Sequence, residues 1–189
     1  MKCRVCNNSI NPFVSFGKMP IANGFLLEKD FKDEYFFELA TAFCEKCFTV
    51  QLETQPDPKL MFHENYAFFS KTSKSMQLHF QEYAEWVLAH YLKKDNSFVV
   101  ELGSNDGILL ENFSKIGIKH LGVEPSANVA GVAIKNGVNT EVAFFDDEFA
   151  NKIVKKNGNA DAILAANVMC HIPNLNEIGK ASKTLLKED

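Results

Sequence analysis

The feature that most constrains this chain is a short apolar run that leads directly into a glycine-containing turn, over residues 98–107. The run Phe98–Val100 is typical of a buried strand, because β-branched and aromatic residues favour that state. The turn has the spacing Glu-x-Gly-x-x-x-Gly, and a helical pattern begins at Ile108. Glycine tolerates positive φ, so such a turn can present the free N–H groups of a helix start to a ligand. The sequence therefore predicts a strand, a turn and a helix that together bind a small molecule.

The residues of this turn indicate the kind of ligand. The turn lacks the Gly-x-Gly-x-x-Gly spacing of dinucleotide-binding folds. Glu101, an acid just before the first glycine, would repel a pyrophosphate, whereas it suits a ligand with a cationic amino-acid end. An ordinary tight turn is the alternative. The candidate cofactor-binding residues of this stretch are Glu101, Gly103, Ser104, Asn105, Asp106 and Gly107.

Strand and helix patterns alternate about every twenty residues from Phe98 onward, which is typical of βαβ units and a parallel sheet. The predicted strands lie near 98–102, 119–124, 140–144 and 161–166. The predicted helices lie near 108–116, 126–136, 147–157 and 174–186. A longer helix, roughly Ser73 to Leu92, precedes them. Its apolar stripe at helical spacing comprises Met76, Phe80, Tyr83, Val87 and Tyr91.

Further candidate residues follow the later strands, because open α/β sheets bind ligands at the carboxyl ends of their strands. Glu124, followed by Pro125, ends the second strand, where nucleotide-binding folds hold a ribose diol. A solvated loop acid is the alternative for Glu124. Phe144 and Phe145 end the third strand and suit an adenine ring, although Phe144 suits the core equally well.

Two polar residues stand beyond the fourth predicted strand. Asn167 and His171 occupy the position where a substrate would meet the cofactor. A buried histidine with satisfied hydrogen bonds is the alternative for His171. We expect Cys170 to be simply packed, because the sequence gives no sign of a partner that activates it.

Four of the five cysteines form two Cys-x-x-Cys pairs, Cys3 with Cys6 and Cys44 with Cys47. Two such pairs can supply four thiolates to one tetrahedral Zn²⁺. Two disulfides are one alternative, which a cytosolic chain disfavours. A redox Cys-x-x-Cys is another, although these pairs lack the βαβ context of thioredoxin. Four ligands would close the site, so we expect the zinc to be structural.

The segments around the cysteine pairs predict a small β-structure. Residues 12–16 and 21–25 are short apolar runs broken by turn residues, whereas 36–43 predict a strand and 49–52 its hairpin partner. Residues 55–58 mark the end of this module. So small a module has little core of its own, and we expect it to need the metal.

Composition argues against several kinds of partner. The net charge is −4 and the chain has no run of Lys or Arg, which disfavours nucleic acid. No apolar stretch is long enough to span a membrane, and the N-terminal Met-Lys-Cys-Arg-Val-Cys is not a signal peptide. We therefore expect a cytoplasmic protein with neither a nucleic-acid partner nor a membrane partner.

Taken together, these motifs resemble those of the nucleotide-sugar C-methyltransferases, enzymes that depend on S-adenosylmethionine (SAM). The resemblance spans nearly the whole chain and rests on both cysteine pairs and on residues 66–70, 101–107, 122–125, 144–145 and 167–174. It implies an α/β fold, with a small zinc-binding module before an incomplete class I methyltransferase sheet that is Rossmann-like and parallel with flanking helices. The implied domains are a zinc module at 1–60, an aromatic linker and long helix at 61–96, and a partial SAM-binding domain at 97–189.

The resemblance also implies a reaction on a nucleotide-linked keto-deoxysugar. A proton leaves the carbon next to the ketone, and the resulting enolate attacks the methyl group of SAM. The implied catalytic residues are His171 and Tyr66. Tyr66 lies in a segment similar to the Tyr-x-Phe/Tyr-Phe-Ser segment that faces the active site in this family. A linker whose aromatic residues merely pack between the domains is the alternative.

The predicted sheet has fewer strands than the class I methyltransferases, which continue with further strands and a C-terminal domain. We therefore expect an N-terminal and cofactor-binding portion that is incomplete for catalysis, with its C-terminal portion separate or missing. The alternatives are a non-catalytic zinc- and SAM-binding remnant or scaffold, and a methyltransferase for another small molecule. A zinc-ribbon RNA methyltransferase is disfavoured by the net charge of −4, and an NAD enzyme by Glu101 and the glycine spacing.

Overall fold

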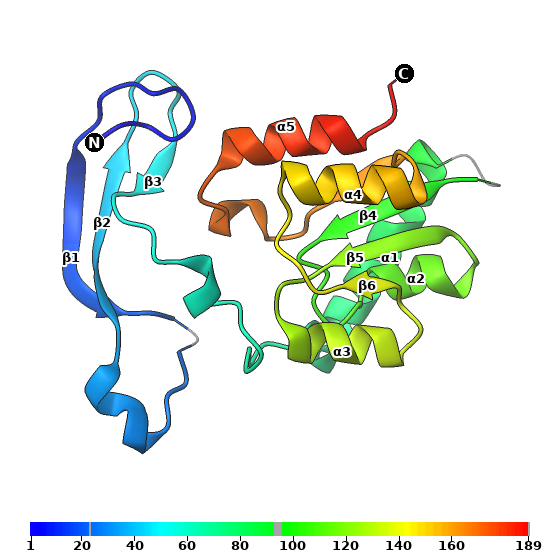
Figure 1. Cartoon of the computed structure of the whole chain (residues 1–189), viewed down its shortest axis with the longest axis horizontal. Coiled ribbons are helices and arrows are strands. Elements are labelled where there is room, and N and C mark those ends of the chain that lie inside the picture. Colours follow the sequence, from blue (N-terminus) through cyan, green and yellow to red (C-terminus); the bar gives the residue numbers. More distant parts are fainter. Residues whose placement is uncertain (23, 93–95, 189) are drawn as a thin grey trace. The chain divides into compact units, whose positions relative to one another are not determined.

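The computed structural model describes residues 1–22, 24–92 and 96–188. The chain divides into two units, both drawn in Figure 1. Unit 1 comprises Met1–Phe62 together with His171–Asn176, and unit 2 comprises His63–Cys170 together with Glu177–Asp189. Within the described ranges, no helix is both long enough and apolar enough to cross a membrane.

Unit 1 is built on an antiparallel sheet in the order β1-β2-β3. Its strands are β1 (Pro12–Pro20), β2 (Phe36–Phe43) and β3 (Val50–Leu52), and its 3₁₀ helices are η1 (Glu28–Asp33) and η2 (Pro58–Leu60). The predicted strand at 36–43 and its hairpin partner are confirmed. β1 is longer than the broken apolar run predicted, because a register shift between Ser15 and Lys18 accommodates Gly17 at φ 75° within the strand.

Unit 2 contains a parallel sheet in the order β6-β5-β4-β7. Its strands are β4 (Phe98–Leu102), β5 (Lys119–Val123), β6 (Thr140–Glu141) and β7 (Ala162–Leu164). All five residues of β4 are buried, as expected for a central strand with both faces covered. The predicted order of strands and helices is confirmed, but β6 stops at Glu141. The predicted extension to residue 144 is wrong because Val142 and Phe144 remain exposed and gain no burial from sheet pairing.

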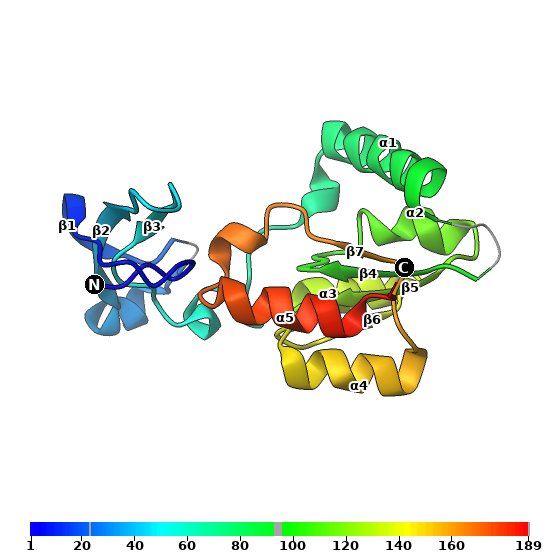
Figure 2. The same ribbon diagram turned by 90° about the horizontal axis from the view of Figure 1, so that it is seen from above.

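The helices of unit 2 cover both faces of this sheet. They are α1 (Lys74–Tyr91), α2 (Leu110–Lys115), α3 (Ala127–Lys135), α4 (Asp147–Asn157) and α5 (Leu175–Leu185), of which the first two residues belong to unit 1. The short 3₁₀ helix η3 (Ser70–Thr72) precedes α1, and a second one, η4 (Met169–His171), ends at His171 of unit 1. Figure 2 shows α1 and α2 on one side of the sheet and α4 and α5 on the other. The side chain of Ser73 caps α1 by accepting a hydrogen bond from the Met76 N–H at 3.3 Å.

The main core of unit 2 lies between the helices α1 to α3 and the sheet. Phe80, Ala84 and Val87 of α1 pack with Phe113 of α2, among other buried side chains. The apolar stripe predicted for α1 is therefore correct at the centre of the helix and wrong at its two ends. Met76 and Tyr91 stand in the first and last turns and are 36% and 59% exposed.

Candidate cofactor site and metal centre

The turn after β4 depends on its two glycines. Gly103 has φ +63°, and a Cβ atom there would lie 2.5 Å from Cγ2 of Val168. Gly107 has φ +79°, and its Cβ would lie 3.0 Å from the side chains of Ala133 and Val138. A side chain at either position would meet backbone strain, together with a steric clash at Gly103 and a tight contact at Gly107. The glycines thus let the turn pack tightly at the carboxyl end of β4, which is the edge where open α/β sheets bind their ligands.

Three buried carboxylates surround this turn. Glu101, Asp106 and Glu124 are 3%, 1% and 4% exposed. Burial raises the pKa of all three, and the negative charges of Glu124 and Asp106 raise the pKa of Glu101 further, to well above its usual range. Among the described residues, Oε2 of Glu101 and Oδ1 of Asp106 have no hydrogen-bond partner. A cationic ligand would satisfy these oxygens and favour their ionised state, so the residues present fit the ammonium and sulfonium groups of SAM.

Glu124 directly follows β5, which ends at Val123, one residue earlier than the predicted strand. Its Oε2 accepts a hydrogen bond from the Asn105 N–H at 2.9 Å, and its Oε1 accepts one from the Ser126 N–H at 2.8 Å. Each carboxylate oxygen can accept more than one hydrogen bond, so both can still receive a hydroxyl. Ser104 packs against Gly122, where a Cβ would lie 2.4 Å from the serine Oγ. Two backbone N–H groups thus fix the orientation of the Glu124 carboxylate, and its assignment to the ribose stays a prediction.

The aromatic segment before α1 lies against the same turn. Ser70 N–H donates to Oδ1 of Asn105 at 3.1 Å, and Lys71 N–H donates to Oδ2 of Asp106 at 2.8 Å. Burial and the negative charge of Glu124 raise the pKa of Tyr66, which lies in the same segment. The structure therefore brings Tyr66 and the glycine turn together within unit 2.

These contacts give Asn105 and Asp106 a role that the motif does not predict. Their side chains hold the backbone of the aromatic segment, whereas the sequence suggested only contacts with the cofactor. Asn128, which sequence reasoning missed, joins them because its Nδ2 donates to the carbonyl of Tyr66 at 2.7 Å. The available signal was the tendency of Asn and Asp in turns to bond to backbone groups.

The remaining predicted residues of unit 2 lie outside the strands. Phe144 is 40% exposed, and the following acid, Asp146, accepts a hydrogen bond from the Phe149 N–H at 2.7 Å and so caps α4. Asn167, just after β7, is exposed at φ 56°, and its Oδ1 lies 3.8 Å from the exposed thiol of Cys170. The assignments of Phe144, Phe145, Pro125 and Asn167 to the cofactor stay predictions.

His171 belongs to unit 1 rather than to the unit that holds the carboxylates. Its ring packs edge-on against Phe62, with the ring centroids 6.0 Å apart. It is exposed, so the alternative of a buried, satisfied histidine does not hold. The catalytic role of His171 stays a prediction.

The four cysteines of unit 1 converge on one point. Their Sγ atoms all lie within 4.8 Å of one another, and those of Cys3 and Cys47, and of Cys6 and Cys44, are 3.5 Å apart. Tetrahedral Zn–S bonds of about 2.3 Å would place the sulfurs about 3.8 Å apart. None of the cysteines, all of which the structure describes, forms a disulfide. The thiols are therefore arranged as a tetrahedral metal centre requires.

The two cysteine pairs are held by the same local geometry. Asn7 N–H donates to the Cys3 carbonyl at 2.9 Å, and Phe48 N–H donates to the Cys44 carbonyl at 2.7 Å. Asn7 and Phe48 have φ angles of 59° and 60°. Each pair thus lies on the same tight turn, in which a left-handed residue follows the second cysteine.

The four neighbouring thiols influence one another's ionisation. The Cys6 N–H and other donors lower the pKa of Cys3 to about 6. The Asn8 N–H acts to lower the pKa of Cys6, but burial and the neighbouring sulfurs outweigh it and raise that pKa to about 11. Four adjacent thiols cannot all ionise without a compensating cation, and a bound metal ion supplies that charge.

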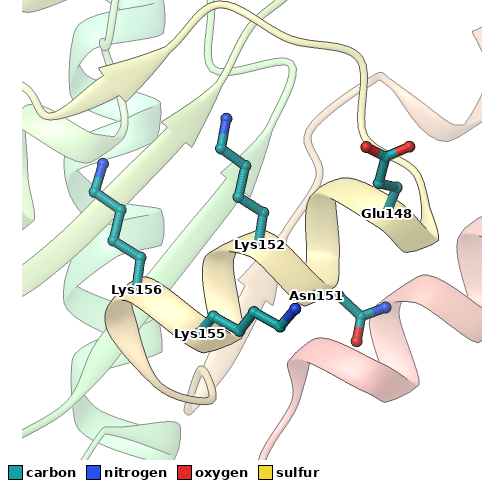
Figure 3. A pocket seen from close by; sticks show the side chains of 5 residues that line it. All are labelled: Glu148, Asn151, Lys152, Lys155 and Lys156. Atoms are coloured by element: carbon teal, nitrogen blue, oxygen red, sulfur yellow. The ribbon is translucent and has the colours of Figure 1, made fainter.

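A separate surface hollow lies along α4. It is lined by Glu148, Asn151, Lys152, Lys155 and Lys156, all exposed residues of that one helix. Figure 3 shows Lys152 and Lys156 extending to the same side of α4. None of the predicted cofactor residues lines this hollow, so we do not assign the site there.

Comparisons with known proteins match both parts of the chain. Residues 3–62 match a family described as "Putative zinc binding domain", and residues 76–189 match one described as "Methyltransferase domain". C-methyltransferase NovU of Streptomyces niveus is 32% identical over 190 residues, covering 100% of this chain and 45% of NovU. The chain therefore spans about half the length of this curated relative.

Solved structures with partial similarity include several methyltransferases. Magnesium protoporphyrin IX methyltransferase ChlM from Synechocystis PCC 6803, with bound SAM, is 16% identical with a TM-score of 0.46, covering 59% of this chain and 54% of its own. A SAM-dependent methyltransferase from Archaeoglobus fulgidus is 15% identical with a TM-score of 0.49, covering 59% and 48%. The family assignment rests on the methyltransferase-domain match, which extends over more than half of the residues: the chain belongs to the methyltransferase family and carries a zinc-binding domain before its methyltransferase domain.

Proposed function

We propose that this chain is the zinc-binding and cofactor-binding portion of a SAM-dependent C-methyltransferase that acts on a nucleotide-linked keto-deoxysugar. The observation that carries the proposal is the group of three buried carboxylates, Glu101, Asp106 and Glu124, around the glycine turn of a methyltransferase domain. Transfer to carbon is supported by the relative named C-methyltransferase NovU. The sugar acceptor is supported by the motifs that this chain shares with nucleotide-sugar C-methyltransferases.

The cationic groups, the ribose and the adenine of SAM each have a candidate partner in unit 2. Glu101 and Asp106 would face the cationic amino-acid end, because their unpaired oxygens are buried beside the turn. Glu124 would accept the ribose hydroxyls, while Phe144 and Phe145 would lie against the adenine ring and Asn167 beside the cofactor. When bound, SAM supplies the electrophilic methyl group.

The acceptor carbon needs a base and a donor for the oxygen that becomes negative. Burial and Glu124 raise the pKa of Tyr66, so its hydroxyl stays protonated at neutral pH and can donate a hydrogen bond to a substrate oxygen. His171 is the candidate proton acceptor of this chain. The zinc in the four-thiol centre would hold the fold of unit 1, because four cysteine ligands leave no open position for a substrate.

The cofactor assignment is tested by calorimetric titration of SAM into zinc-loaded residues 1–189, with NAD as the control. We expect micromolar SAM binding and no NAD binding, since three buried acids would oppose a pyrophosphate. A folded protein that binds NAD in preference to SAM would contradict the proposal.

The acceptor assignment needs a second titration, with the chain saturated by S-adenosylhomocysteine. We expect a nucleotide-linked 4-keto-deoxysugar to bind and the corresponding unlinked sugar to bind much more weakly. SAM binding without any acceptor binding would favour the alternative of a zinc- and SAM-binding scaffold. Binding of unrelated small acceptors would favour a methyltransferase for another small molecule.

A further inference from the structure

Residues 66–71, here called the strap, are tied to the cofactor half by side chains of that half. The Asn105 side chain makes two of these bonds, accepting from the Ser70 N–H at 3.1 Å and donating to the Phe68 carbonyl at 3.0 Å. Asp106 accepts from the Lys71 N–H at 2.8 Å, and Asn128 donates to the Tyr66 carbonyl at 2.7 Å. In every case the strap contributes a backbone group. The bonds therefore fix the path of the strap and do not depend on its side chains.

The same residues connect the strap to the candidate ligand groups. The Asn105 N–H donates to Oε2 of Glu124, so one residue contacts both the strap and the carboxylate proposed for the ribose. Asp106 uses Oδ2 for the strap, while its buried Oδ1 has no partner among the described residues. An ion pair between Lys71 and Glu111 of α2 adds a further attachment. The strap therefore adjoins the candidate cofactor site. Asn105 and Asp106 belong to that site and also bind the strap.

We propose that Asn105, Asp106 and Asn128 are positioning residues that hold the strap across the cofactor site, so that SAM dissociates only when the strap lifts. The inference rests on the proposed function, because it assumes that SAM is the ligand. It changes the role that the motif suggests for Asn105, whose side chain is occupied by the strap. Its backbone N–H, in contrast, orients the acid for the ribose.

Two variants remove the same hydrogen bond from opposite sides. Asn105→Gly removes both side-chain bonds to the strap, together with the bond that Oδ1 accepts from the Asp106 N–H at 2.9 Å within the turn. It suits the backbone, because residue 105 has φ 50°. Ser70→Pro removes only the N–H donor, and it suits the first position of η3 because Phe69 is extended at φ −113° and ψ 114°. As the control, Asn112→Ala loses two bonds to the carbonyls of Ile108 and Leu109 that do not involve the strap.

The test measures the dissociation rate of SAM and, without SAM, the hydrogen exchange of the strap amides. We expect dissociation to become about fivefold faster in Ser70→Pro, which loses one bond to the strap, and tenfold or more in Asn105→Gly, which loses two bonds to the strap. The double variant should match Asn105→Gly, because the bond that proline removes is already lost. Strap exchange should rise in both single variants, and Asn112→Ala should behave as wild type in both measurements.

The outcomes separate this inference from the proposed function. A wild-type chain that does not bind SAM overturns the proposed function, whereas the exchange experiment still reports whether the strap is fastened. If the two strap variants bind SAM and show faster strap exchange but the wild-type dissociation rate, the positioning role is overturned, while the proposed function is not. Equal acceleration in Asn112→Ala would indicate a general loss of structure and would also overturn it.

Discussion

Replacing Glu101 by glutamine should have opposite effects on fold stability and on SAM affinity. The carboxyl group is 3% exposed, and burial together with the charges of Glu124 and Asp106 raises its pKa well above the usual range. In the unfolded chain a glutamate ionises near pH 4.3. The folded state thus binds more protons above that pH, and the stability of the wild type falls as the pH rises toward the folded pKa. Glutamine has the same shape and does not titrate, so Glu101→Gln should escape this loss.

The size of the effect follows from the proton linkage. One extra proton bound by the folded state changes the free energy of unfolding by at most about 1.4 kcal/mol per pH unit. Between pH 5 and pH 7 the wild type should therefore lose up to about 2.7 kcal/mol of stability relative to the variant. For a chain of 189 residues, 1 kcal/mol changes Tm by about 2–4 °C. Loss of a charged hydrogen-bond partner should raise the Kd for SAM by roughly 10- to 100-fold.

Thermal unfolding of the SAM-free chain at several pH values, together with calorimetry of SAM binding, measures both effects. The matched control is Glu141→Gln, which loses a surface pair with Lys156 at 2.8 Å. Such a pair contributes at most about 1 kcal/mol to stability. The control should leave SAM affinity unchanged, because Glu141 is not among the residues proposed to bind SAM. A Glu101→Gln variant whose Tm falls relative to wild type at pH 7 would refute the reasoning, because the carboxylate would then stabilise the fold.

Three other substitutions test separate parts of the structure. Glu124→Ala should weaken SAM binding by at least about tenfold in calorimetry by removing charge-assisted bonds to the diol, whereas unchanged affinity would contradict the ribose assignment. Cys44→Ser should abolish stoichiometric zinc, measured by metal analysis, and unfold unit 1; full zinc retention would exclude the four-thiol centre. Gly103→Ala should lower the free energy of unfolding by about 2 kcal/mol or more in denaturant titration. Gly117→Ala, also at positive φ but with open space around it, should cost less, and equal losses would show that the clash is unimportant.

The sequence predicts most reliably the parts of this fold that local physics determines. β4 follows from an apolar run that is buried on both faces, and the turn after it follows from glycines whose φ angles exclude other residues. The end of β6 could not be read in this way, because Phe144 is apolar and yet remains exposed. Apolar character favours burial, but only the neighbouring elements decide whether a surface is available to cover the residue.

The candidate site shows the same division between local and long-range causes. The position of Glu124 follows from its place at the end of β5, and the four cysteines follow from their spacing. The role of the Asn105 side chain does not follow from the motif, because its partner Ser70 lies 35 residues away. The partners of the Asn105 side chain become visible only in the tertiary structure, where the strap packs against the turn.

The acidic group beside this turn links stability to ligand binding. Glu101, Asp106 and Glu124 all have raised pKa values, so ionising them opposes folding, while a cationic ligand favours the ionised form. SAM binding must therefore lower these pKa values and release protons, and its affinity must rise with pH over the range in which the stability of the ligand-free chain falls. An anionic dinucleotide would take up protons instead, and its affinity would fall with pH. The direction of proton exchange in calorimetry thus identifies the charge of the ligand for which this site is built.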